Sequence, residues 1–258
     1  MSKNKLAKFA EMEHYPHVFQ AGSIATATEP HPMRGAWHTF FGNHNPIVLE
    51  LGCGRGEYTV GLARLFPDKN FIGVDIKGAR LWKGAKYATE HSLPHVGFLR
   101  TRIEFISSLF AEGEVSELWI TFADPQIGRE KKRLTAPLFL DRYRGFMKTG
   151  GRINLKTDSR YLYEYSCAIA RQNSLNILAC TEDLYNTENA SLEGILSRES
   201  VDSLFEVQTF YEKHFLAQGY PITYLCFEIG HQGPYVSPQW DEDRWKGEDH
   251  HAFAVTIH

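Results

Sequence analysis

Two groups of residues have the types and the spacing of a site for a nucleoside-containing cofactor. The first is the run Glu50-Leu-Gly52-Cys-Gly54-Arg-Gly56, and the second is Asp75, which closes an apolar run. Glycines let the backbone turn sharply and approach a ligand closely. A carboxylate at the end of a strand can accept hydrogen bonds from both hydroxyls of a ribose.

The glycine spacing argues against a dinucleotide. The dinucleotide fingerprint places its third glycine three residues beyond the second, whereas here the gap is two. Glu50 also puts a negative charge where a pyrophosphate has to bind. The same carboxylate suits the cationic amino-acid end or the sulfonium of S-adenosylmethionine, because opposite charges attract strongly in a partly buried cleft. The pattern favours S-adenosylmethionine over NAD, and leaves open an ordinary turn followed by a strand-end Asp.

A third group lies further along the chain. Asp124-Pro125 follows the apolar run Leu118-Trp-Ile-Thr-Phe, and the basic cluster Arg129-Glu-Lys131-Lys132-Arg133 comes soon after. A proline holds the preceding residue on stiff, extended backbone, which helps to aim a hydrogen bond from the carboxylate. The cluster has the charge to bind phosphates. A turn-initiating Asp beside a solvated charge run is the alternative.

These groups need an open α/β sheet to bring them together, because ligands bind at the carboxyl ends of its parallel strands. Short β-type runs alternate with helical ones between residues 47 and 158, which is typical of such a sheet. The predicted strands are 47–51, 71–76, 96–99, 118–122, 152–156 and 222–229. The predicted helices are 57–66, 79–91, 105–110, one capped by Thr135 with Pro137 in its first turn, 161–171 and 209–218. The motifs all fall at strand ends.

The rest of the chain carries weaker signals. Residues 181–201 have mixed polarity and are predicted to be an insertion or a mobile loop, while 1–40 and 231–258 show no clear period. We expect an N-terminal arm (1–40), a catalytic domain (41–230) and a C-terminal extension (231–258), both ends packing on the domain or on a ligand.

Composition excludes several classes of protein. The 258 residues are 43% hydrophobic and can bury one substantial core. The apolar runs are far shorter than a membrane span. The four cysteines are scattered, which favours reduced thiols in the cytoplasm and no metal site. The net charge is −3, yet ten basic residues face three acidic ones between Arg129 and Arg160, so the charge is polarised.

Taken together, the motifs resemble the tRNA (guanine-N7)-methyltransferase family from about residue 3 to 230. The resemblance rests on Glu50-Leu-Gly-Cys-Gly, Asp75-Ile76, Phe122-Ala-Asp124-Pro125, Lys131-Lys-Arg-Leu134, Lys156-Thr-Asp158, and Thr209-Phe-Tyr-Glu212 with Gly219. It implies a Rossmann-like class I methyltransferase fold with a mostly parallel seven-stranded sheet and helices on both faces. It also implies methyl transfer from S-adenosylmethionine to N7 of the variable-loop guanine of tRNA, releasing S-adenosylhomocysteine.

The resemblance assigns roles residue by residue. Asp124 is expected to be catalytic. The cofactor is expected to contact Glu50, Gly52, Gly54, Gly56, Asp75, Ile76, Arg102 and Asp124. The tRNA is expected to contact Asp158, Thr209, Tyr211, Glu212, Arg129, Lys131, Lys132 and Arg133, with Lys3, Lys5 and Lys8 on its backbone.

Two departures from the family pattern leave roles unassigned. The family often has Pro-Asp-Pro-Trp followed by a lysine, where this chain has Ala123-Asp-Pro-Gln126 and Gly128. Arg102 stands where an acidic or amide residue is common, so adenine recognition is unassigned. The alternatives are a methyltransferase for a small molecule or another RNA, and a noncatalytic tRNA-binding protein. A monomer and a homodimer are both expected to be possible.

Overall fold

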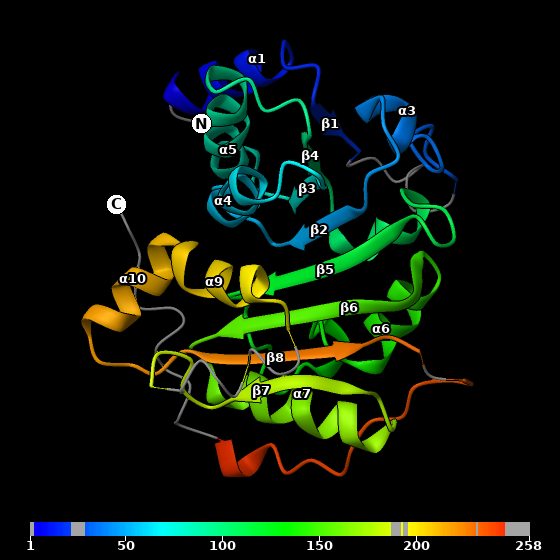
Figure 1. Ribbon diagram of the computed structural model, residues 1–258, viewed down its shortest axis with the longest axis vertical. Helices are drawn as coiled ribbons and strands as arrows, with labels where there is room; N and C mark the ends of the chain where they lie inside the picture. The colour runs from blue at the N-terminus through cyan, green and yellow to red at the C-terminus, as the bar shows by residue number, and fades with distance from the viewer. Residues whose placement is uncertain (1–2, 22–28, 187–191, 193–195, 231, 246–258) are drawn as a thin grey trace.

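One eight-stranded sheet organises the chain (Figure 1). The computed structural model describes residues 3–21, 29–186, 192, 196–230 and 232–245. The strands, in their order across the sheet, are β1 (Val18–Gln20), β4 (Val96–Arg100), β3 (Asn70–Asp75), β2 (Ile47–Leu51), β5 (Val115–Thr121), β6 (Met147–Thr157), β8 (Thr223–Glu228) and β7 (Ile177–Thr181). Neighbouring strands pair in parallel except at β8, which is antiparallel to both β6 and β7.

Helices cover both faces of this sheet. The α-helices are α1 (Lys3–Met12), α3 (Trp37–Phe41), α4 (Glu57–Leu65), α5 (Gly78–Glu90), α6 (Pro137–Arg144), α7 (Arg160–Gln172), α9 (Arg198–Glu206) and α10 (Phe210–Ala217), with 3₁₀ turns η1 (Ile103–Ser108), η2 (Glu130–Lys132) and η3 (Asp243–Trp245). One core cluster joins the sheet to α3, η1, α6 and α7, and a second joins the opposite face to α4, α5 and α9. None of these described helices has both the length and the apolar character that a bilayer crossing needs.

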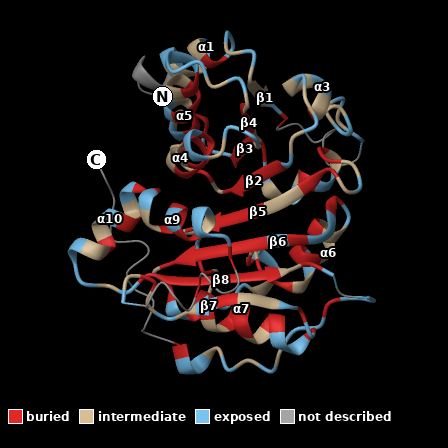
Figure 2. Cartoon of the chain, viewed as in Figure 1, coloured by how far each residue is buried: buried red, intermediate tan, exposed pale blue. Residues whose placement is uncertain are grey.

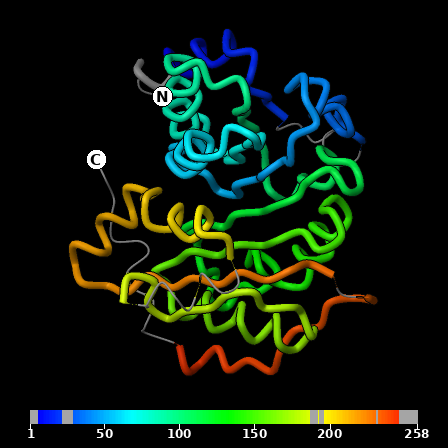
Figure 3. The backbone as a smooth tube through the Cα atoms, viewed as in Figure 1, coloured from blue at the N-terminus to red at the C-terminus, as the bar shows by residue number. Residues whose placement is uncertain are grey.

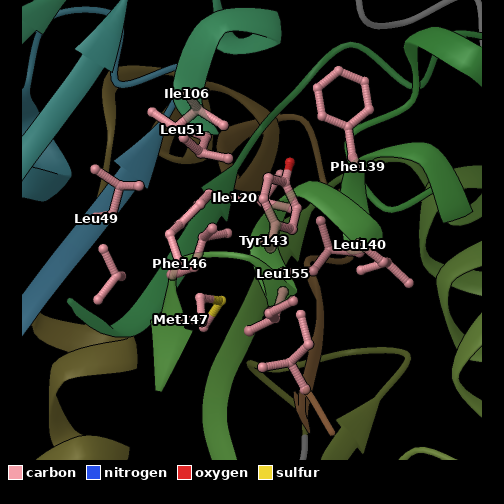
Figure 4. Packing of buried hydrophobic residues seen from close by; sticks show 14 of the residues in the cluster. Leu49, Leu51, Ile106, Ile120, Phe139, Leu140, Tyr143, Phe146, Met147 and Leu155 are labelled. Atoms are coloured by element: carbon pink, nitrogen blue, oxygen red, sulfur yellow. The ribbon is translucent and has the colours of Figure 1, made fainter. Parts of the chain in front are cut away.

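The central strands are apolar because both of their faces are covered. Every residue of β2 and β3 is buried, and Figure 2 shows this burial as a continuous band through the middle of the sheet. Sheets covered on both sides read as continuous apolar runs rather than as alternating ones. Figure 4 shows one face of this packing, where Leu49, Ile120 and Leu155 of the strands meet Phe139 and Tyr143 of α6.

The predicted fold class is confirmed, with one strand more than the seven expected. The eighth strand, β1, comes from the N-terminal segment that showed no period, and pairs with β4. Three residues are too few for an alternating pattern to be visible in the sequence. The helix α1 from the same segment packs on α5. The described part of this arm therefore lies on the sheet and on α5, while the division into three parts stays a prediction.

Other departures are local. Strand β6 begins at Met147 rather than at residue 152, and α6 has Ala136 at its N-cap instead of Thr135. The hydroxyl of Thr135 accepts a hydrogen bond from Ser166 on α7, at 2.8 Å, so a tertiary contact replaces the predicted cap. The predicted insertion at 181–201 contains the beginning of α9, and its residues 187–191 and 193–195 lie outside the described residues.

The carboxyl ends of the parallel strands form one edge, and the predicted motifs lie along it. Strands β2 and β5 are neighbours, so the chain leaves the two central strands in opposite directions across the sheet. The tube in Figure 3 shows the same crossing of the chain from the first half of the sheet to the second. Such a switch point is where open α/β sheets bind ligands.

Candidate active site

The glycine-rich turn after β2 brings backbone to the edge of the sheet. Gly52, Gly54 and Gly56 all have positive φ, at 76°, 54° and 70°. A Cβ on Gly52 meets no atom within 4 Å, whereas one on Gly56 lies 2.8 Å from the Phe98 ring. Gly52 thus borders open space, and Gly56 allows the turn to pack against β4.

Glu50 lies beneath this turn and is only 3% exposed. One carboxylate oxygen accepts hydrogen bonds from the amide of Thr59, at 2.9 Å, and from its hydroxyl; the other accepts from the hydroxyl of Thr121, at 2.7 Å. Burial raises the pKa of Glu50, the hydrogen bonds from the two threonines oppose that rise, and the nearby Asp75 adds to it.

Asp75 ends β3 on the other side of the turn. Its two oxygens accept one backbone bond each, from the amide of Gly54 at 2.9 Å and from that of Lys77 at 2.6 Å. A carboxylate offers about four acceptor positions, so this geometry leaves positions for two further donors.

Neither carboxylate has a cationic partner in the part of the chain that the structure describes. The ion pairs found there involve other groups, and the donors to Glu50 and Asp75 are amides and hydroxyls. Two nearby carboxylates with no counter-ion create a negative potential at the cavity wall. The site is therefore suited to a cationic ligand that also carries hydroxyl donors.

Two hollows meet at this edge, and Asp124 lies where they join. The first, of about 290 Å³, is lined by Glu50, Asp75 and Asp124 among others. The second, of about 660 Å³, shares Gly52, Asp75 and Asp124 with the first and continues to Ile76, Arg102 and Ile103. The structure thus brings together the three carboxylates that the sequence singled out.

Asp124 differs from the other two carboxylates in being exposed. It follows β5 after Phe122, which has a φ of 49°, and its Oδ1 accepts a hydrogen bond from the amide of Gln126 at 2.9 Å. This short turn orients the carboxylate while leaving it open to a ligand in either hollow.

The wall opposite the cofactor side comes from the second half of the chain. Asp158, which follows β6, lines the first hollow together with Thr209, Tyr211 and Phe215. Thr209 caps α10 in a capping box, accepting from the amide of Glu212 at 3.1 Å, while Glu212 accepts from the amide of Thr209 at 3.4 Å.

Glu212 does not line the hollow, contrary to the prediction. Its side chain is fully buried and pairs with Lys156 of β6, with 2.5 Å between Nζ and Oε1. It also accepts from the hydroxyl of Tyr185 at 2.7 Å. Burial lowers the pKa of Lys156, and Glu212 opposes that change. The Glu212 carboxylate pairs with the buried amine of Lys156 because an unpaired charge in the core is costly.

The basic cluster divides into two parts. Arg129, Lys131 and Lys132 are exposed, and Lys132 lines the second hollow. Arg133 is wholly buried, so the prediction that it contacts phosphate is wrong. Its guanidinium donates to the carbonyls of Pro125 and Gln126 at 3.0 and 3.2 Å.

Some residues at the edge were not expected from the sequence. Thr59 and Thr121 hold Glu50, and Arg80 lines the first hollow. Their types gave no signal, since a helix threonine and an arginine on an exposed face have many uses. The side chains of Lys3 and Lys5 lie outside what the structure describes, and Lys8 lies over the Trp82 ring at 4.7 Å. Among the described residues, no three His, Cys, Asp or Glu side chains are grouped so that they could hold a metal ion.

Comparisons with known proteins find relatives along most of the chain. The family model "Putative methyltransferase" matches residues 44–223. A tRNA (guanine-N(7)-)-methyltransferase of Bacteroides fragilis is 49% identical over 92% of this chain and 90% of its own length. Another, of Christiangramia forsetii, is 47% identical over 88% of this chain and 99% of its own.

Solved structures show the same fold at lower identity. The 16S rRNA methyltransferase KamB aligns with a TM-score of 0.55 at 14% identity, over 76% of this chain and 93% of its own. An antibiotic-related methyltransferase aligns with a TM-score of 0.54 at 17% identity, over 80% of this chain and 98% of its own. At these identities the likeness shows the fold alone. From the extent of the sequence matches, the chain belongs to the tRNA (guanine-N7)-methyltransferase family.

Proposed function

We propose that this protein transfers a methyl group from S-adenosylmethionine to N7 of the variable-loop guanine in tRNA. One observation carries the proposal: Asp124 stands at the junction of a carboxylate-walled hollow and a second hollow bordered by exposed basic residues. S-adenosylmethionine supplies an electrophilic methyl group. The protein's own residues have to bind it and aim the guanine.

Different residues would hold the charged amino-acid end, the ribose and the flat adenine of the cofactor. Glu50 would face the cationic amino-acid end, because that buried carboxylate has no counter-ion of its own among the described residues. Asp75 would accept from the two ribose hydroxyls with the lone pairs that the backbone leaves unused. Ile76, Ile103 and Arg102 line the second hollow and would hold the adenine there.

The guanine side needs no base. N7 of guanine carries an in-plane lone pair and no proton, so catalysis reduces to alignment and electrostatics. The Asp124 carboxylate accepts from the N1–H and N2–H₂ edge of the guanine, or stabilises the positive charge that moves onto the purine. Asp158, Thr209 and Tyr211 complete the wall, and Arg129, Lys131 and Lys132 hold the RNA backbone. We expect the enzyme to work in the cytoplasm, as a monomer or a homodimer.

Nucleoside mass spectrometry tests the proposal. Unmodified bulk tRNA is incubated with protein and S-adenosylmethionine, digested and analysed; we expect N7-methylguanosine. Parallel reactions contain ribosomal RNA or small-molecule acceptors. Methylation of those acceptors in place of tRNA would favour the alternative substrates. Failure to bind S-adenosylmethionine by calorimetry would favour a noncatalytic tRNA-binding protein.

A further inference from the structure

The C-terminal segment 232–245, here called the strap, returns along α7 to the active-site edge. At one end, Asn173 after α7 donates to the carbonyl of Val236 at 2.9 Å and accepts from its amide at 2.8 Å. At the other end, Trp245 is buried against Tyr161 in the first turn of α7. Figure 1 shows this segment in red alongside α7. Helix α7 begins at the carboxyl edge of the sheet, so the strap ends beside the loop 125–128, which follows Asp124.

Glu242 of the strap contacts that loop directly. One carboxylate oxygen lies 3.1 Å from a guanidinium nitrogen of Arg133, and the other accepts from the amide of Gly128 at 3.2 Å. The hydroxyl of Tyr161 donates to the same carboxylate. Partial burial raises the pKa of Glu242, but the hydrogen bonds from Tyr161, Arg133 and Gly128 outweigh it and leave that pKa below its ordinary value.

Arg133 carries the contact on to Asp124. Its guanidinium packs over the Tyr165 ring at 3.9 Å and donates to the carbonyls of Pro125 and Gln126. The amide of Gln126 then donates to Asp124. Gln126 has a φ of 53° and Gly128 one of 67°. Left-handed backbone in a non-glycine residue persists only where the surroundings hold it.

We propose that Glu242 is a positioning residue for methyl transfer, holding the loop 125–128 and so the Asp124 carboxylate through Arg133. This inference rests on the proposed role of Asp124. It assigns a role in the reaction to a segment beyond the 44–223 match to the family model. It also explains why Arg133, in a basic cluster beside an RNA site, is buried: its charge is used within the protein.

Steady-state kinetics of the full-length protein test the inference. The variants are Glu242→Ala and Glu242→Gln, and Asp241→Asn is the control, since it removes one negative charge from the exposed neighbouring position. We expect Glu242→Ala to lower kcat at saturating tRNA and S-adenosylmethionine by roughly ten- to a hundredfold, because small misplacements of catalytic groups cost that much. Affinity for S-adenosylmethionine should change less than kcat, since Glu50 and Asp75 do not contact the strap.

The kcat of Glu242→Gln should fall between those of Glu242→Ala and wild type, because its amide oxygen still accepts from Gly128 while the charge facing Arg133 is lost. Arg133→Lys should lower kcat as well, and the double variant with Glu242→Ala should lose less than the product of the single losses, because both act through one contact. Asp241→Asn should behave as wild type.

The positioning role of Glu242 and the proposed function would be contradicted by different results. Wild-type kcat in both Glu242 variants, with or without a lower melting temperature, would overturn the positioning role and leave the strap a purely structural segment. If Glu242→Ala does not fold, Glu242→Gln decides. Wild-type protein that forms no N7-methylguanosine in tRNA would instead overturn the proposed function.

Discussion

The three carboxylates at the carboxyl edge of the sheet lie in two different environments, which suit different roles. Glu50 and Asp75 are buried and held by hydrogen bonds, whereas Asp124 is exposed at the junction of the hollows. Buried carboxylates without a counter-ion favour a cation strongly. An exposed carboxylate is accessible and can be covered by a base that enters the pocket.

The first prediction concerns Asp124. In Asp124→Asn the amide oxygen can still accept from the amide of Gln126, so the turn is retained while the charge is lost. We expect kcat to fall by about 10²- to 10³-fold, the usual effect of removing one electrostatic group aimed at the reacting centre. Methyl incorporation into tRNA measures it. Asp202→Asn on the exposed side of α9 serves as the control, and turnover near wild type in Asp124→Asn would remove the residue from catalysis.

The second prediction uses the raised pKa of Glu50. Because its pKa is higher in the folded than in the unfolded protein, the unfolded state loses its proton first as pH rises. The stability from this group is therefore complete below the ordinary carboxyl pKa of about 4.3 and is lost as pH rises through the raised value. Glu50→Gln should thus be more stable than wild type at neutral pH, and that gain should shrink as pH falls.

Urea unfolding across pH measures this effect, with Asp68→Asn, in an exposed turn, as the control. The same variant should bind S-adenosylmethionine roughly tenfold or more weakly, since it lacks the charge that faces the cation. A Glu50→Gln protein that is less stable at neutral pH and binds the cofactor normally would contradict both expectations.

The chemistry of these residues was predictable from the sequence, but the burial of some of them was not. The type and order of Glu50, Asp75 and Asp124 at strand ends were sufficient to place them at one edge. Arg133 and Glu212 were misassigned because their partners come from distant parts of the chain. Glu242 lies 109 residues from Arg133, and no local pattern signals such a pair.

At the level of elements, two glycines in the turn after β2 have the same backbone conformation but different surroundings. Gly52 and Gly56 share a positive φ, but only Gly56 is enclosed, by Phe98 and Gly84. An alanine at either position takes a left-handed conformation, at about 1–2 kcal/mol. Alanine at Gly56 also overpacks the interface with β4, which costs about 1–3 kcal/mol more.

The third prediction follows from this difference. Gly56→Ala should lower the free energy of unfolding by roughly 2–5 kcal/mol, whereas Gly52→Ala should lower it by only about 1–2 kcal/mol. Gly52→Ala should nevertheless weaken S-adenosylmethionine binding, because its methyl group enters the space that the cofactor needs. Chemical denaturation and calorimetry give the two quantities. Equal stabilities in the two variants would show that space around Gly56 does not matter.

Elements were predictable where their pattern was long. The central strands and α4, α5 and α7 were placed within a few residues, because buried strands and amphipathic helices repeat over several turns. Strand β1, with three residues, and β7, which pairs only at the edge with β8, lacked such a signal. Their formation depends on partners already in the sheet, and so on tertiary structure.

For the whole molecule, the relevant property is the distribution of charge rather than its sum. The net charge is −3, yet Arg129, Lys131 and Lys132 are exposed, and Lys132 lines the second hollow. An acidic protein can bind RNA where a basic surface borders the site, because the interaction is local and screened within about 10 Å at ordinary salt. Arg133 does not contribute to this surface, since its charge is matched by Glu242.

The last prediction is that Arg129, Lys131 and Lys132 changed together to Ala raise the KM for tRNA and leave S-adenosylmethionine binding intact. Each phosphate contact releases counter-ions, so losing three contacts should lower the slope of log affinity against log salt by about 2–3. A matched triple variant changes Arg64, Lys148 and Arg171 to Ala. It removes three exposed charges that lie in the last turns of α4 and α7 and at the beginning of β6. Filter binding of tRNA at several salt concentrations compares the two proteins. If both variants lose the same affinity and slope, RNA binding responds to net charge alone, and the loop after Asp124 is not the phosphate contact.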